Sequence, residues 1–189
     1  MAVMEAIVET VTESLTQLTI MGDVFLILGF MGLLLKSRGF RLGRMEKLYR
    51  IVSDNGLWMA WLIALIATSG SLFFSEGAGY EPCKLCWFQR IFMYPLVLIL
   101  GLASLKNDRK IVPYVLVMSL VGLLVALYHY YVQTAGGEII PCSITGYAAA
   151  CSDHFVMRYG YVTIVAMSAT AFGLISLVGM VMMSDKKKN

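Results

Sequence analysis

Four apolar runs, each about as long as a bilayer is thick, constrain the fold of this chain more than any other feature. They cover residues 56–74, 85–105, 111–133 and 161–183. A membrane-spanning helix needs about 20 predominantly apolar residues, and only helices and closed barrels satisfy every backbone polar group in lipid. With 59% hydrophobic and 14% charged residues, the chain is also too apolar for a soluble domain. The sequence therefore predicts an all-α integral membrane protein with a four-helix transmembrane bundle.

The first residues of the chain have a different pattern. Glu5, Glu9 and Glu13 lie on one face of a predicted amphipathic helix over residues 1–17, and apolar residues lie on the opposite face. An acidic face is poorly suited to anionic lipid, so we expect this helix to pack against the protein's own helices.

Residues 18–35 are apolar apart from Asp23 and predict an additional N-terminal transmembrane helix. Their uninterrupted part is short for a span, so an interfacial or half-inserted segment is the alternative. We accordingly divide the chain in two. Residues 1–50 hold the amphipathic helix, the extra span and a basic cytoplasmic linker, and residues 51–189 hold the four-helix membrane domain.

The positions of the basic residues predict the orientation of the chain in the membrane. Twelve of the fifteen Lys and Arg residues fall in residues 36–50, 106–110 and 186–188, which lie on one side of the predicted spans. Basic residues collect on the cytoplasmic side, so this side and the C-terminus are expected to be cytoplasmic. The loops 75–86 and 134–160, which contain all four cysteines, are then extracytoplasmic, where disulfides form and persist. This distribution also explains the basic pI of 8.7 without nucleic acid as a partner.

Cys83 and Cys86 form a CxxC pair at the start of the second long run. This spacing suits dithiol exchange, and the first turn of a helix beginning here would favour a thiolate. Arg90 lies four residues after Cys86 and adds a positive charge on the same helical face. The alternatives are half a zinc site or a structural disulfide for the cysteines, and a membrane-edge anchor for Arg90.

Cys142 and Cys151 form a second pair in the long outer loop, with eight residues between them. A disulfide in such a loop is accessible to the thiolate of another protein, although a purely loop-stabilising bridge is the alternative. We expect no metal site, because the second pair lacks the spacing of a zinc knuckle.

The two pairs together predict an electron path. Two electrons enter at the outer pair, pass by exchange to the CxxC and leave to an acceptor that is not a thiol. A membrane quinone is the expected acceptor, because its ring fits a gap between helices lined by aromatic and Met residues. The candidates for this lining are Trp87, Phe88, Met93, Tyr94 and residues 128–131. His129 is placed to donate a hydrogen bond or a proton to a quinone oxygen, or it is a histidine among interfacial tyrosines without that role.

Three segments have a familiar pattern, namely Cys83-Lys84-Leu85-Cys86-Trp87-Phe88-Gln89-Arg90 with the following Met93-Tyr94-Pro95-Leu96, then Leu127-Tyr128-His129-Tyr130, and the stretch from Tyr159 to Ile164. Together they resemble the DsbB family, and specifically its short-loop BdbC branch. The resemblance covers about residues 56–183. It implies a multi-pass protein of a prokaryotic cytoplasmic membrane, which reoxidises a secreted or periplasmic DsbA-like thioredoxin-fold oxidase. The electrons would pass to ubiquinone or menaquinone, and exported proteins would gain disulfides.

The resemblance also implies roles for individual residues. Cys142 would be attacked by the thiolate of the partner, Cys151 would exchange with Cys83, and Cys86 would be the thiolate that faces the quinone. The residues that would line the quinone site are Arg90 and His129. Two features depart from the family pattern, namely the N-terminal extension of about fifty residues and the short spacing of the second pair.

Two other interpretations remain open at this point. A protein similar to vitamin K epoxide reductase also couples loop cysteines to a quinone, but its loop pair precedes the CxxC. A non-catalytic multi-span protein with two structural disulfides is the alternative from another class.

Overall fold

The computed structural model describes residues 2–38, 43–135, 151 and 156–186. The helices are α1 (Ala2–Ser37), α2 (Gly43–Leu72), α3 (Lys84–Lys106), α4 (Val112–Ala135) and α5 (Ile164–Lys186). A π-helical turn, Phe73–Gly77, extends α2, and a 3-10 turn, Arg109–Ile111, precedes α4. The described part of the chain contains no strand. Its five helices are long and apolar enough to cross a membrane, which confirms the all-α fold with an additional N-terminal span.

Helix α5 lies at the centre of the bundle. It packs against α4, α2 and α1, while α3 packs mainly against α2 and α4. Half of its most apolar stretch is buried, against 17% to 28% for the other four helices. The approach to α4 is close, because a Cβ on Gly122 would lie 2.3 Å from the Phe172 ring, and Ser176 donates to Ser119 over 2.9 Å. Small residues and paired hydroxyls are typical contacts between helices in lipid.

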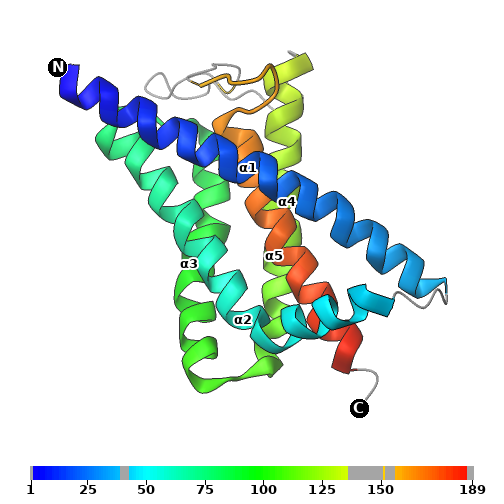
Figure 1. Ribbon diagram of the computed structural model, residues 1–189. Coiled ribbons are helices and arrows are strands. Elements are labelled where there is room, and N and C mark those ends of the chain that lie inside the picture. Colours follow the sequence, from blue (N-terminus) through cyan, green and yellow to red (C-terminus); the bar gives the residue numbers. More distant parts are fainter. Residues whose placement is uncertain (1, 39–42, 136–150, 152–155, 187–189) are drawn as a thin grey trace.

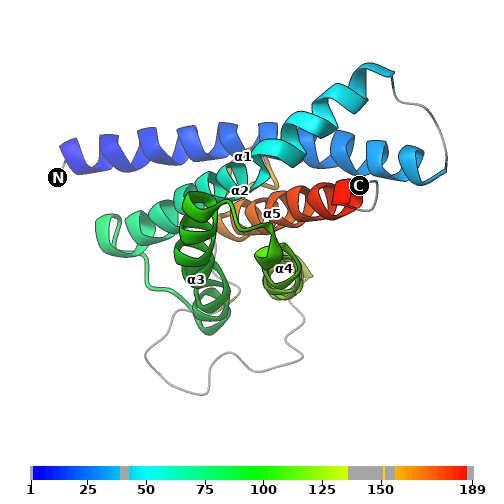
Figure 2. The ribbon, with the colours of Figure 1, turned by 90° about the horizontal axis from the view of Figure 1, so that it is seen from below.

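Helix α1 unites the predicted amphipathic helix and the predicted extra span in one continuous helix of 36 residues. At 1.5 Å per residue it is about 54 Å long, so it crosses a bilayer with a tilt or extends beyond it. In Figure 1, α1 crosses obliquely in front of α2 and α5. Figure 2 shows that it lies on the side of these two helices away from α3 and α4. Helix α2 begins inside the predicted linker, and the division of the chain at residue 50 stays a prediction.

The face that α1 turns toward the bundle consists largely of small polar residues. Thr12, Thr16 and Thr19 are buried, and Leu15 lies between them against Gly70 of α2, whereas Ile7 is 44% exposed. Each threonine hydroxyl donates to the carbonyl four residues earlier and is satisfied within the helix. Lipid is as apolar as leucine, so no hydrophobic force draws large side chains inward, and small residues allow close contact instead. Within the predicted amphipathic helix, Thr12, Leu15 and Thr16 thus lie on the side that faces the rest of the protein.

Helix α3 has defined caps at both ends. Cys83 is its N-cap with an extended backbone, and Asn107 is its C-cap in the left-handed region at φ 50°. The helix continues through Pro95. Cys83 therefore lies just before the first turn of α3 and Cys86 lies within that turn.

Candidate active site

The sulfurs of Cys83 and Cys86 meet at the N-terminus of α3. Both cysteines are free, and their sulfurs are hydrogen bonded at 3.4 Å. The Trp87 N–H donates to the Cys83 carbonyl and closes the first turn of the helix. Unpaired amides and the helix dipole at this end favour a negative charge. The geometry thus suits a dithiol that opens and closes, as the CxxC spacing predicts.

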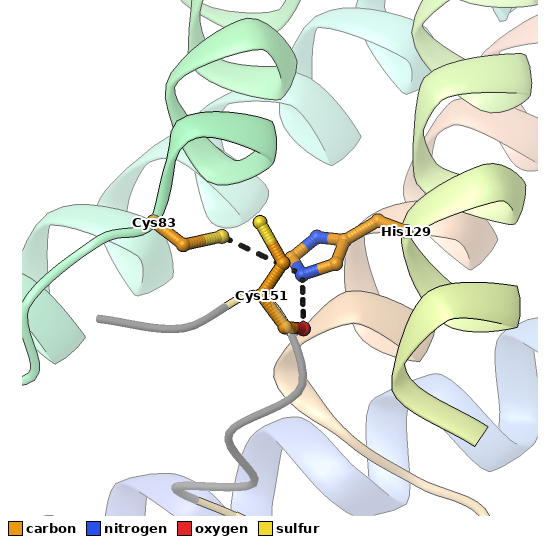
Figure 3. Close-up of side chains that lie close together, drawn as sticks. All are labelled: Cys83, His129 and Cys151. Carbon is orange, nitrogen blue, oxygen red and sulfur yellow. Dashed lines mark hydrogen bonds between the residues drawn. The ribbon is translucent and has the colours of Figure 1, made fainter. Parts of the chain in front are cut away.

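His129 of α4 lies directly against this pair. Its side chain is buried at 2% exposure, and its Nε2 lies 3.5 Å from Cys83 Sγ and 3.2 Å from the Cys151 carbonyl oxygen. Figure 3 shows both cysteines beside the imidazole ring, with Cys83 at the start of α3. His129 was predicted to lie beside a quinone, and its contact with the cysteines was not predicted.

Gln89 fixes the tautomer of His129. Its Oε1 accepts a hydrogen bond from the Ser168 hydroxyl of α5, which orients its amide Nε2 toward His129 Nδ1 at 2.9 Å. An amide nitrogen only donates, so Nδ1 accepts and Nε2 carries the ring proton. His129 therefore donates toward Cys83 and the Cys151 carbonyl. No role was predicted for Gln89 or Ser168, although a glutamine one turn after Cys86 in an apolar helix is a signal that the sequence contains.

The surroundings of Cys83 favour its thiolate. The hydrogen bond with the Cys86 thiol lowers the pKa of the Cys83 thiol most, burial opposes this effect, and His129 lowers the pKa further, to about 4. The thiolate was expected on Cys86, the cysteine that the family resemblance predicts to face a quinone. In this arrangement the negative charge rests on Cys83, because Cys83 receives hydrogen bonds from both Cys86 and His129.

Cys151 brings the second cysteine pair to the first. Cys151 is disulfide-bonded and 1% exposed, and its Sγ lies within 4.8 Å of Cys83 Sγ and of a His129 ring nitrogen. Cys142 lies outside the described residues. A sulfur at this range needs only a small shift to exchange with Cys83. The same three residues have the spacing of metal ligands, but the sulfur of a disulfide offers no thiolate to a metal.

Arg90 is held in place by α2. Its Nε donates to Ser71 Oγ and its Nη2 to the Ser71 carbonyl oxygen, both over 3.1 Å, and its guanidinium lies 5.3 Å from the centre of the Trp87 ring. These contacts fix the side chain in the bundle, one turn beyond Cys86. A membrane-edge anchor would instead extend toward water. The geometry therefore supports a fixed positive charge beside Cys86.

A cleft of about 250 Å³ opens beside these residues between the helices. Its lining includes Cys86, Arg90, Met93, Tyr94 and His129. An apolar cavity of about 150 Å³ already binds benzene, so the cleft accommodates a six-membered ring. Five of the expected lining residues do not contribute to the cleft, namely Trp87, Phe88, Tyr128, Tyr130 and Tyr131. Trp87 and Phe88 are 55% and 51% exposed instead.

The polar groups of the cleft fit a quinone. The Tyr94 hydroxyl is buried and has no hydrogen-bond partner among the described residues, so it can donate to a carbonyl oxygen. Arg90 adds a positive charge for a reduced, anionic ring. His129 also lines the cleft, but both of its nitrogens already have protein partners. The unengaged donor is therefore Tyr94 rather than His129.

Comparison with known proteins gives a consistent result. The family model of disulfide bond formation protein DsbB matches residues 54–184. Disulfide bond formation protein C of Bacillus subtilis is 40% identical over 134 residues, which are 70% of this chain and 95% of that protein. The probable disulfide formation protein C of Halalkalibacterium halodurans is 41% identical over 133 residues, 70% of this chain and 96% of that protein. No solved structure matches the chain.

The match covers α3, α4, α5 up to residue 184 and α2 from residue 54 onward. It therefore includes Cys83, Cys86, Cys151 and His129 and most of the cleft lining. The resemblance noted in the sequence is thereby confirmed at the level of the family. The structure adds the membrane-spanning helices and the free dithiol that such an enzyme requires. The chain belongs to the DsbB family, and it is a multi-pass membrane oxidoreductase that generates disulfides.

Proposed function

We propose that this protein is a thiol:quinone oxidoreductase that reoxidises an extracytoplasmic thioredoxin-fold oxidase of the DsbA or BdbD type. Electrons pass through two cysteine pairs to a membrane quinone, and exported proteins gain disulfides. The observation that carries the proposal is a continuous series of sulfurs. Cys151 lies within 4.8 Å of Cys83, Cys83 is hydrogen bonded to Cys86, and Cys86 lines the cleft.

Electrons enter through the outer pair. A thiolate of the partner attacks Cys142 and breaks its disulfide with Cys151, and the second thiol of the partner then releases the oxidised partner. The Cys151 thiolate attacks Cys83, which breaks a Cys83–Cys86 disulfide and leaves Cys86 reduced. Cys142 then attacks Cys151, which restores the outer disulfide and frees Cys83. The free Cys83 and Cys86 and the disulfide-bonded Cys151 correspond to the end of this sequence.

Electrons leave at the cleft. A quinone bound there supplies an acceptor for two electrons and two protons. The chain holds Cys83 as a thiolate next to Cys86, so the Cys83–Cys86 disulfide forms as the pair gives up two electrons. Arg90 stabilises negative charge beside Cys86, and Tyr94 donates a hydrogen bond at the same cleft. The dithiol loses two electrons and its remaining proton, and the second proton comes from water.

The proposal places the sulfurs on the extracytoplasmic side and the C-terminus in the cytoplasm. Its support is the distribution of basic residues, twelve of which lie on the opposite side. A membrane-impermeant thiol reagent added to intact cells tests this placement. It should label the reduced outer pair, and labelling only after the cells are broken would contradict the orientation.

A direct test mixes the purified protein with a reduced thioredoxin-fold oxidase and a soluble quinone without oxygen. Quinone absorbance should fall as the partner is oxidised, and Cys83→Ala should abolish the change. An exposed substitution on the same helix, Leu98→Ala, serves as the matched control. Absence of quinone reduction, or reduction that persists in Cys83→Ala, would refute the function.

A further inference from the structure

Helix α1 lies outside the part of the chain shared with its relatives. The family model begins at residue 54, and the two relatives are matched over 95% and 96% of their own length while 30% of this chain stays unmatched. Yet α1 is not a detached addition. Three of its side chains, Leu15, Leu18 and Thr19, line the same cleft as Cys86 and Arg90.

Close packing fixes α1 on α5. A Cβ on Gly22 would lie 2.8 Å from Thr170 Cγ2, and one on Gly29 would lie 2.4 Å from Leu177 Cδ2. From the other side, a Cβ on Gly173 would lie 3.0 Å from Leu26 Cδ1. Such contacts at small residues bring helix backbones together in lipid. Helix α1 is therefore held firmly against α5, and its side chains form a fixed part of the cleft lining.

Polar contacts secure the same helix near the cleft. Thr170 of α5 donates to Asp23 Oδ1 over 2.7 Å, and the Tyr161 hydroxyl donates to Asp23 Oδ2 over 3.3 Å. Arg158 lies 3.4 Å from Glu9 and 3.6 Å from Glu13. The segment before α5 thus contacts α1 at two places, through Tyr161 at Asp23 and through Arg158 at the two glutamates.

The contact of α1 with α2 lies next to Ser71, the residue that holds Arg90. Leu15 packs against Gly70, where a Cβ would lie 3.1 Å from Leu15 Cδ1. The next residue, Ser71, accepts both hydrogen bonds of Arg90. The α1 wall of the cleft therefore adjoins the cation that lies beside Cys86.

We propose that α1 forms part of the quinone site and that the isoprenoid tail of the quinone lies against Leu15 and Leu18. This inference rests on the proposed function. The ring must reach Cys86 on α3, and Figure 2 shows α1 on the opposite side of α2 and α5. Packed helices lie about 8–10 Å apart, so a ring in contact with Cys86 leaves only the tail to reach α1.

The chemistry of the α1 wall also fits a tail. Leu15 and Leu18 are apolar, and the Thr19 hydroxyl donates to the Leu15 carbonyl, so α1 directs no unpaired donor at the cleft. The donors for a ring, Arg90 and Tyr94, come from α3. A hydrocarbon chain is the ligand part that needs no polar partner.

Two substitutions on α1 test the inference, measured as KM for two quinones with the same ring, one with a long isoprenoid tail and one without a tail. Leu18→Trp fills the cleft from a partly exposed position, and it should raise KM for the long-tailed quinone roughly tenfold. Leu15→Ala removes a contact and should raise the same KM about fivefold. Neither should change KM for the tail-less quinone, or the rate of exchange with the reduced partner. Leu28→Trp, on the exposed face of α1, is the matched control.

Cys86→Ala, measured in parallel, separates the two proposals. Loss of quinone reduction in Cys86→Ala, with KM unchanged in both α1 variants, would overturn the role of α1 alone. An equal rise of KM for both quinones would also overturn it, because α1 would then affect the ring or the fold. Quinone reduction that persists in Cys86→Ala would overturn the proposed function itself.

Discussion

The cleft has two sides that are held together by different forces. On the α3 and α4 side, polar groups connect in series from Ser168 through Gln89 and His129 to Cys83. On the α1 side, helices meet at glycines, and the polar contacts are separate pairs, such as Thr170 with Asp23 and Arg158 with Glu9. The first side must place a proton and a charge at a sulfur, which requires directional bonds. The second side must only exclude lipid and shape a wall, for which close contact suffices.

The largest effect is expected on the polar side, from His129→Leu. Above its pKa of about 4 the Cys83 thiol is ionised, so alkylation of Cys83 should be constant from about pH 5 upward and fall in more acidic solution. Loss of His129 removes a hydrogen bond to the thiolate and raises this pKa, by about one to two units. Alkylation at pH 5 should then fall about two- to tenfold.

The measurement is the pH profile of iodoacetamide labelling at Cys83, read by peptide mass spectrometry. Tyr131→Leu, an exposed change on the same helix, is the control. An unshifted profile in His129→Leu would show that the imidazole only packs against the sulfur.

On the α1 side, Gly29→Ile should have the next largest effect. A branched side chain would overlap Leu177 and force α1 from α5, at a cost of about 1–3 kcal/mol. The thermal midpoint of the purified protein in detergent should fall, and KM for a long-tailed quinone should rise. The Cys83 labelling profile should stay unchanged, since the polar side does not depend on α1. Ala6→Ile, on an exposed position of α1, controls for bulk alone.

The contrast between the two sides also explains what the sequence could predict. The spans, the CxxC and the extra helix follow from local patterns, namely apolar length, spacing and charge. The contact of His129 with Cys83 depends on how α4 is rotated against α3, and no local pattern encodes that rotation. Gln89 was visible as a polar residue one turn after Cys86, but its partners come from α4 and α5.

The contact face of α1 could not be read from its amphipathic pattern, for a different reason. In lipid no hydrophobic force selects large apolar side chains for the interior, so an apolar face does not identify the contact face. Thr12, Thr16, Thr19 and Gly22 recur every three or four residues and form the readable signal. The sequence does not show which helix these residues contact, because small residues allow close packing against any neighbouring helix. The role of Cys142 and the orientation of the chain in the membrane stay predictions.

A smaller effect is expected from Tyr94→Phe, which removes one hydroxyl from the cleft. A hydrogen bond between neutral groups contributes about 0.5–1.5 kcal/mol, so KM for the tail-less quinone should rise about two- to tenfold. Labelling of Cys83 should be unaffected. Tyr114→Phe, at an exposed position on α4, is the control. An unchanged KM would mean that the ring does not approach Tyr94.

The smallest effect is expected from Arg158→Gln, which removes the ion pairs with Glu9 and Glu13. These groups are partly or largely exposed, with side-chain exposures of 38%, 68% and 36%, and such pairs contribute about 0–1 kcal/mol. The thermal midpoint should hardly move, and the small difference from the unsubstituted protein should vanish in high salt. Asp23→Asn is the informative companion, because Asp23 accepts hydrogen bonds from Thr170 and Tyr161. If Arg158→Gln destabilised the protein as much as Gly29→Ile, charge rather than close packing would hold α1, and the contrast between the two sides of the cleft would fail.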